Sequence, residues 1–231
     1  MYNKKITKNK YTNFFYKNGF IKKNFKNNEI INSLFQKLED EHRNQNDRER
    51  IFCHLNNFQF ANNIKKTDSQ FFLYNIENDY LLGLANMIKE DKIFDNTIKY
   101  YLKSDYRIVN VRCWRYFSNI KNDLRDDVRA HFDGLPHKTL KIMIYKGRFT
   151  KEYPALDTLG TDNMKLKYSV KGINPMILLD TCHLIHRAKL PIRDRDTIEI
   201  TIQPKLFDGK PLFGGFSAGY PINPFFKSTI K

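Results

Sequence analysis

The chain has 231 residues, of which 41% are hydrophobic and 14% aromatic, enough to bury a full core and to exclude an intrinsically disordered protein. Lysine and arginine total 40 against 25 acidic residues, giving a formal net charge of +15. Three widely spaced cysteines argue against a disulfide framework, and the lack of a long apolar run argues against a membrane span. We therefore expect a soluble, cytoplasmic protein.

The first 30 residues carry eight lysines and one acidic residue, with aromatic residues between them. Such a segment can bind phosphates and stack its rings on bases, or lie at a membrane surface. The whole chain is rich in Lys, Asn, Ile, Phe and Tyr, as AT-rich coding sequences are, and we favour this compositional origin of the charge. If the positive charge has a functional role, it would favour a negatively charged substrate, with nucleic acid possible but not favoured.

Three helices are predicted in the first half of the chain. Apolar residues recur at helical spacing over 29–38, and the charged stretch 39–50 that follows is expected to face solvent. A second helix is predicted over 81–90, capped by 78–80, and a third over 95–102. We expect these helices to support one sheet.

Two strands are predicted next, over 106–117 and 139–145. In the first, Arg112, Trp114 and Tyr116 share one face, and either face of the strand could line a pocket. We expect Trp114 to lie in the core and the arginines of this strand to lie at the surface.

The first candidate site residues are His131 and Asp133, which flank Phe132. Residues i and i+2 of a strand point the same way, so one short strand can direct both side chains to one metal ion. Taken alone, this pair could also be an ordinary surface pair before a turn. A third ligand from later in the chain would make it a metal site.

That third ligand is predicted in the segment 176–188, which is apolar, rich in strand-forming residues and contains His183 and His186. In a regular strand these two histidines face opposite sides, so we expect only one of them to be a ligand. We favour His186, because the chain turns soon after it, and keep His183 as the alternative. Two histidines and one carboxylate can hold a redox-active iron on one face.

A further strand is predicted over 195–202, where Arg195 and Thr197 share one face and isoleucines form the other. Its position soon after His186 suggests that the two strands are antiparallel neighbours. The guanidinium of Arg195 could bind a carboxylate through two hydrogen bonds, with the Thr197 hydroxyl beside it. Arg193 is the alternative for this role.

In this order, the segments 130–134 and 139–145, the pair His186-Arg187 and then Arg195 resemble the iron(II)- and 2-oxoglutarate-dependent dioxygenases. The resemblance is greatest to the phytanoyl-CoA dioxygenase-like branch, although the His-Arg and later Arg residues are also similar to the penicillin-synthase-like branch. It covers roughly residues 106–204.

The resemblance implies a mainly β fold with flanking helices, around a double-stranded β-helix (jelly-roll) core. It also implies Fe(II) bound by His131, Asp133 and His186, with 2-oxoglutarate bound by Arg195 and Thr197. With O2, such an enzyme hydroxylates its substrate and releases succinate and CO2. Asp133 argues against halogenation, since halogenases of the family lack this ligand.

We expect a small anionic metabolite or biosynthetic intermediate as the substrate. The alternatives are the same chemistry on nucleic acid or protein, and a jelly-roll protein that binds polyanions without catalysis. Nothing in the sequence indicates the oligomeric state.

We expect the chain to form a single domain. Residues 1–104 would form a basic segment and supporting helices, 105–204 the jelly-roll core with the metal site, and 205–231 a C-terminal extension. Within the core, 153–160 and 172–175 are predicted to be turns.

Overall fold

The computed structural model describes residues 8–25, 28–44, 71–74, 78–118, 130–133, 138–160, 165–189 and 191–205. The C-terminal extension beyond residue 205 and residues 45–50 of the charged stretch 39–50 lie outside the described residues.

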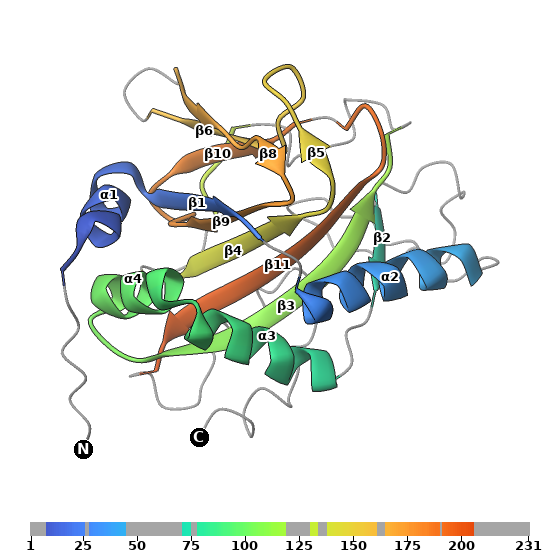
Figure 1. Ribbon diagram of the computed structural model, residues 1–231. Coiled ribbons are helices and arrows are strands. Elements are labelled where there is room, and N and C mark those ends of the chain that lie inside the picture. Colours follow the sequence, from blue (N-terminus) through green and yellow to red (C-terminus); the bar gives the residue numbers. More distant parts are fainter. Residues whose placement is uncertain are drawn as a thin grey trace.

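The largest element is a six-stranded sheet in which all neighbouring strands are antiparallel (Figure 1). Its strands, in spatial order, are β1 (Phe20–Asn24), β9 (Pro175–Leu179), β4 (Leu140–Tyr145), β11 (Arg195–Pro204), β3 (Tyr106–Tyr116) and β2 (Phe71–Tyr74). Consecutive strands of the chain are often not neighbours in this sheet, as in a jelly roll.

A smaller layer lies over one face of this sheet (Figure 1). It contains a three-stranded sheet, β10 (Ile185–Ala188), β6 (Leu156–Leu159) and β7 (Leu166–Ser169), and a strand pair, β5 (Arg148–Phe149) and β8 (Gly172–Ile173). The isolated bridge between His131 and His186 adds the 130–133 segment beside β10. The predicted mainly β jelly-roll architecture is confirmed.

The other face of the large sheet is covered by α2 (Glu29–Asn44), α3 (Asn78–Glu90) and α4 (Lys92–Leu102), while α1 (Lys10–Asn18) packs beside α4 and β1 (Figure 1). The three predicted helices are present. The helix α4 begins earlier than predicted because Asp91, and not Asp95, caps it. The carboxylate of Asp91 accepts hydrogen bonds from the backbone N–H groups of Ile93 and Phe94. No helix of the described part is long and apolar enough to span a membrane.

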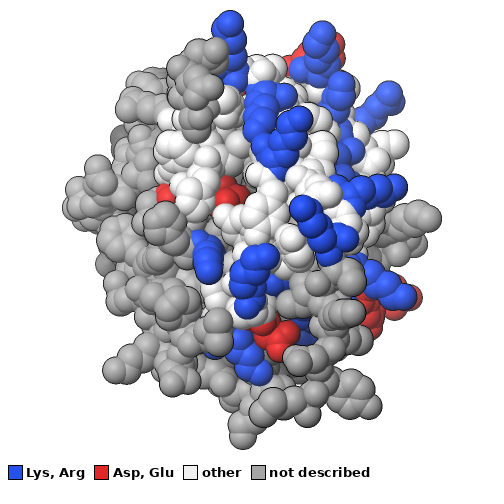
Figure 2. Space-filling view, turned by 90° about the vertical axis from the view of Figure 1, so that its left-hand side faces the viewer, with Lys and Arg blue, Asp and Glu red and all other residues white. Residues whose placement is uncertain are grey.

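The helix α1 and the strand β1 show where the aromatic residues of the basic amino-terminal segment lie. Phe15, Phe20 and Phe25 are buried in the core, while Phe14 and Tyr16 remain about half exposed. Several of the aromatic residues between the lysines therefore stabilise the fold and are not free to stack on bases. Viewed from the side of α1, the described surface carries many Lys and Arg side chains and few acidic ones (Figure 2).

Two apolar clusters hold the layers together. The outer cluster lies between the helices and the large sheet and includes Leu34, Phe94, Ile98, Ile142 and Ile200, all fully buried. The inner cluster lies between the two β layers and includes Trp114, Met143, Tyr145, Ile177 and Leu156. The alternation of side chains along each strand assigns neighbouring residues to different clusters.

Trp114 lies in the core as predicted, but the arginines on either side of it are not at the surface. Arg115 is buried on the helix side, where it donates two hydrogen bonds to Asp196, of 2.7 and 3.0 Å, and another to Glu39 of α2. Arg112 points to the interior and binds Glu199. Paired carboxylates compensate for the cost of burying these guanidinium groups.

The segment 176–188 is not the single strand predicted from its composition. The strand β9 ends at Leu179, residues 180–184 form a turn, and β10 begins at Ile185 in the other sheet. The strands β10 and β11 are consequently not neighbours, because β10 pairs with β6 and β11 pairs with β3 and β4. Half of the predicted turn over 153–160 is the strand β6, with which β10 pairs.

Candidate metal centre

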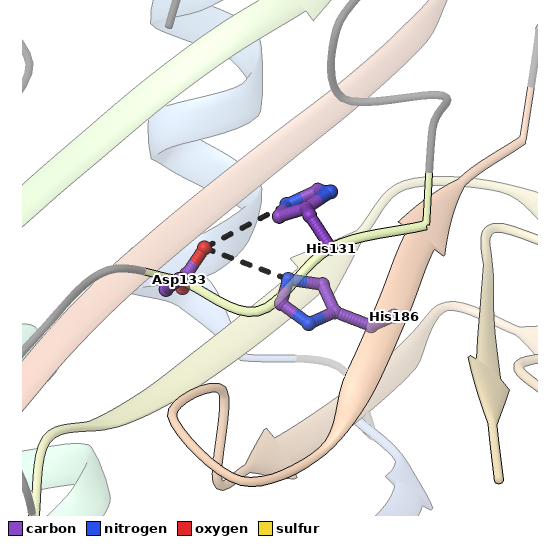
Figure 3. A group of neighbouring side chains, drawn as sticks. All are labelled: His131, Asp133 and His186. Atoms are coloured by element: carbon purple, nitrogen blue, oxygen red, sulfur yellow. Dashed lines mark ion pairs between the residues drawn. The ribbon is translucent and has the colours of Figure 1, made fainter. Parts of the chain in front are cut away.

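His131, Asp133 and His186 converge in the interior of the β layers (Figure 3). The Nε2 atoms of both histidines lie 3.7 Å from Oδ1 of Asp133, and potential ligand atoms of the three residues lie within 4.8 Å of one another. The two imidazole rings are tilted, with their centroids 4.5 Å apart. Two imidazoles and one carboxylate in this arrangement suit a divalent metal ion.

Backbone pairing brings the three residues together. The N–H of His131 donates to the carbonyl of His186 and the N–H of His186 donates back, each over 3.0 Å. The N–H of Asp133 donates to the carbonyl of Thr181, in the turn between β9 and β10. Asp133 is thus held by the turn, and not by a regular strand shared with His131, yet both side chains reach the same space.

His186 is prepared to be a ligand through Nε2. Its Nδ1 donates to the carbonyl of Leu184 over 3.0 Å, which leaves the lone pair of Nε2 facing Asp133 and His131. Burial lowers the pKa of this imidazole, against the opposing effect of Asp133. The neutral form, which metal ligation requires, is therefore favoured.

Asp133 is ionised despite its burial. Burial by itself would raise its pKa, but the ammonium of Lys141 holds the pKa well below its ordinary value. Lys141 remains charged for the matching reason: burial would lower its pKa, but Asp133 and Glu199 outweigh this and raise it. The anion that would bind a metal is therefore present at neutral pH.

His183 lies elsewhere. Its side chain is 47% exposed, and its Nδ1 lies 3.0 Å from both carboxylate oxygens of Asp180. Asp180 also accepts a hydrogen bond from Tyr101 of α4. The structure thus brings His186, and not His183, to His131 and Asp133, since the turn separates the two histidines.

Arg195 and Thr197 face the same interior from β11 and are fully buried. The Nη1 of Arg195 donates to the carbonyls of Ala155 and Lys189, over 2.9 and 2.8 Å, and its guanidinium lies 5.0 Å from the ring centre of Tyr116. Its Nε and the Oγ1 of Thr197 are buried without a hydrogen-bond partner in the described part of the chain. Buried donors of this kind are costly unless a ligand satisfies them.

The alternative cation, Arg193, is exposed and donates to the carbonyl of Arg148 over 2.7 Å. It therefore stabilises the adjacent loop at the surface, outside the interior that contains Arg195.

Sequence reasoning missed a chain of charged residues on the interior face. Arg112, Glu199 and Lys141 follow one another on adjacent strands and end at Asp133. Their alternation with the apolar residues of the predicted strands could have indicated which way they point. It could not have shown that Lys141 contacts Asp133, because that contact depends on the path of the 130–133 segment.

No family model matches the sequence, and no curated protein matches it as a relative. Solved structures are similar in fold. The carbocyclase SnoK from nogalamycin biosynthesis, a non-heme enzyme dependent on α-ketoglutarate (2-oxoglutarate), is 12% identical with a TM-score of 0.55, and the match covers 90% of this chain and 94% of that one.

Two other solved structures show the same likeness. HygX from Streptomyces hygroscopicus, solved with nickel and 2-oxoglutarate, is 12% identical with a TM-score of 0.53, and the match covers 87% of this chain and 88% of HygX. A prolyl hydroxylase from Trichoplax adhaerens, in complex with a peptide fragment of hypoxia inducible factor, is 14% identical with a TM-score of 0.52 over 83% and 86%.

These likenesses show that the chain has the jelly-roll fold of the 2-oxoglutarate-dependent oxygenases. They do not distinguish a branch, so the assignment to the phytanoyl-CoA dioxygenase-like branch stays a prediction.

Proposed function

We propose that the protein is an iron(II)- and 2-oxoglutarate-dependent oxygenase that hydroxylates a small anionic molecule and releases succinate and CO2. The main support is the convergence of His131, Asp133 and His186 inside the fold that such oxygenases share. Two imidazoles and one carboxylate can hold a metal ion on one face, which would leave its opposite positions open for cosubstrate and oxygen.

The donor set fits the two groups that this function requires. The neutral imidazole of His186, the imidazole of His131 and the ionised carboxylate of Asp133 suit ferrous iron. Iron would supply the oxygen-activating chemistry when bound. The unsatisfied Nε of Arg195 and hydroxyl of Thr197 suit the distal carboxylate of 2-oxoglutarate. The fork of Arg195 is already oriented by two backbone carbonyls, so little ordering would be needed on binding.

The substrate class rests on charge. The chain has a net charge of +15, and lysines and arginines dominate the described surface in Figure 2, so an anion would be attracted to the molecule. Among the similar structures, HygX has been solved with hygromycin B and the Trichoplax enzyme with a peptide fragment. A macromolecular substrate is therefore the alternative to a small anionic molecule.

The function is tested by measuring conversion of 2-oxoglutarate to succinate by the purified full chain with ferrous iron, ascorbate and O2. We expect slow uncoupled turnover that requires iron and disappears in a folded His186→Ala variant. A folded wild-type protein that neither binds a divalent metal nor consumes 2-oxoglutarate would contradict the proposal.

A further inference from the structure

A buried lysine lies against the carboxylate of the metal centre. The Nζ of Lys141 is 2.8 Å from Oδ2 of Asp133 and 3.3 Å from Oε2 of Glu199, and its side chain is only 12% exposed. A buried ammonium is costly unless it is paired, and here it lies between two carboxylates. The contact thus differs from the weak ion pairs of a protein surface.

The two oxygens of Asp133 have different surroundings. Oδ1 is equally distant, 3.7 Å, from the Nε2 atoms of His131 and His186, so it faces the point at which the three ligand atoms converge. Oδ2 faces the ammonium of Lys141. A carboxylate held in this way can offer one oxygen to a metal ion while its second oxygen remains bound to the lysine.

We propose that Lys141 is a positioning residue that makes Asp133 a one-oxygen ligand of the metal centre. With the second carboxylate oxygen withheld, one more position of the metal stays open to cosubstrate and oxygen. This inference rests on the proposed function, since it concerns the same site.

The surroundings of Lys141 restrict its movement. Glu199 is 4% exposed, and its Oε2 lies 3.3 Å from the Nζ of Lys141. Glu199 also accepts hydrogen bonds from Arg112, whose guanidinium packs on Trp114 at 4.6 Å from the ring centre. If the ammonium turned away, two buried carboxylates would each lose a partner. The chain of alternating charges therefore holds the ammonium on Oδ2.

The test is titration of the metal-free full chain with Co²⁺ by calorimetry, without 2-oxoglutarate. The variants are Lys141→Met, which keeps the volume and removes the charge, and Lys141→Arg, which keeps a cation. Lys146→Met is the matched control, because Lys146 follows the end of the same strand and is exposed.

We expect Lys141→Met to weaken Co²⁺ binding about 10- to 100-fold, as loss of a partner of a metal ligand commonly does. Lys141→Arg should recover part of this loss, and Lys146→Met should bind as the wild type does. A role in folding alone would lower the fraction of molecules that bind and leave the Kd of the folded ones unchanged. The visible spectrum of bound Co²⁺, which reports its coordination, should also change in Lys141→Met.

An unchanged Kd and an unchanged Co²⁺ spectrum in folded Lys141→Met would overturn the inference while leaving the proposed function intact. If that variant does not fold, the double variant Lys141→Met/Glu199→Gln removes both charges of the Lys141–Glu199 pair. Wild-type Co²⁺ affinity in this double variant would likewise overturn the inference. If the folded wild type binds no divalent metal, the inference and the proposed function both fail.

Discussion

The two faces of β11, a central strand of the six-stranded sheet, differ in chemistry over most of the length of the strand. On its outer face, under the helices, β11 presents three fully buried isoleucines: Ile198, Ile200 and Ile202. On its inner face the same strand presents polar and charged side chains: Arg195, Thr197 and Glu199. Every one of these residues is buried, so burial alone does not distinguish the two faces.

The difference separates stability from function within one strand. The outer face removes apolar surface from water, which is the main favourable contribution to folding. The inner face buries charges and unsatisfied donors, which oppose folding unless they are paired or bind a ligand. Substitutions on the outer face should therefore change the free energy of unfolding, and those on the inner face should change metal and cosubstrate binding.

The largest effect is expected at the metal ligands. Asp133→Asn keeps the shape of the side chain but removes the negative charge, so turnover of 2-oxoglutarate should fall by more than ~100-fold. This exceeds the effect of losing a residue that only contacts a metal ligand. Metal affinity should fall in parallel in the same preparation, as measured by calorimetry. Retention of wild-type metal affinity in this variant would assign the metal to other residues.

A large effect on stability is expected from the outer face. Ile200→Ala should lower the free energy of unfolding by about 2–5 kcal/mol, and Ile200→Val by about 0.5–1.5 kcal/mol, because of the cavity each leaves. Urea unfolding measures both values. The Co²⁺ affinity of the folded molecules should be unchanged, and a change in that affinity would show that the two faces are coupled.

An intermediate effect is expected at Arg195. Arg195→Lys keeps the charge but loses the fork, so the affinity for 2-oxoglutarate should fall by about 1.5–3 kcal/mol, or roughly 10- to 100-fold. Calorimetry in the presence of a redox-inert divalent metal measures this affinity. Arg193→Ala is the control and should bind normally, since the exposed side chain of Arg193 donates to the carbonyl of Arg148. If Arg193→Ala weakened 2-oxoglutarate binding and Arg195→Lys did not, Arg193 would be the residue that binds the carboxylate of 2-oxoglutarate.

The smallest effect concerns the ion pairs at the edge of the outer face. The hydrogen bond from Arg115 holds the pKa of Glu39 below its ordinary value, against the effect of burial. The stability that this pair contributes is present above the ordinary glutamate pKa and is lost as the pH falls through the lowered pKa. Because Glu39 is partly exposed, the contribution should be at most about 1 kcal/mol.

Urea unfolding of the wild type and of Glu39→Gln tests this contribution. The two proteins are compared at neutral pH and at roughly pH 3, which lies below the ordinary glutamate pKa. The difference between the two proteins should shrink in acid. A difference that grows in acid would contradict the assigned direction of the pKa shift.

The site was predictable where it depends on local periodicity. The alternation along β11 places Arg195 and Thr197 on one face, and the spacing of His131 and Asp133 allows both to point one way. For His183 and His186 the rule favours the histidine that the structure brings to the site, but its premise does not hold. It assumes a continuous strand, whereas the chain turns at 180–184 to cross between sheets.

Two further features depended on contacts between distant segments. Arg115 is buried because Asp196 and Glu39 pair with it, and neither partner is close to it in the sequence. The aromatic residues of the basic amino-terminal segment are divided between core and surface by the packing of α1 on α4 and of β1 on β9. A count of charges in that segment cannot show this division.

The sequence by itself determined which residues could act together, because side-chain chemistry and the period of a strand are local properties. Only the tertiary structure decided that His186 joins His131 and Asp133 and that Lys141 holds the carboxylate. These contacts are made by strand pairings and turns between segments far apart in the chain. The free energy of such pairings comes from burial of the whole core, which no short motif contains.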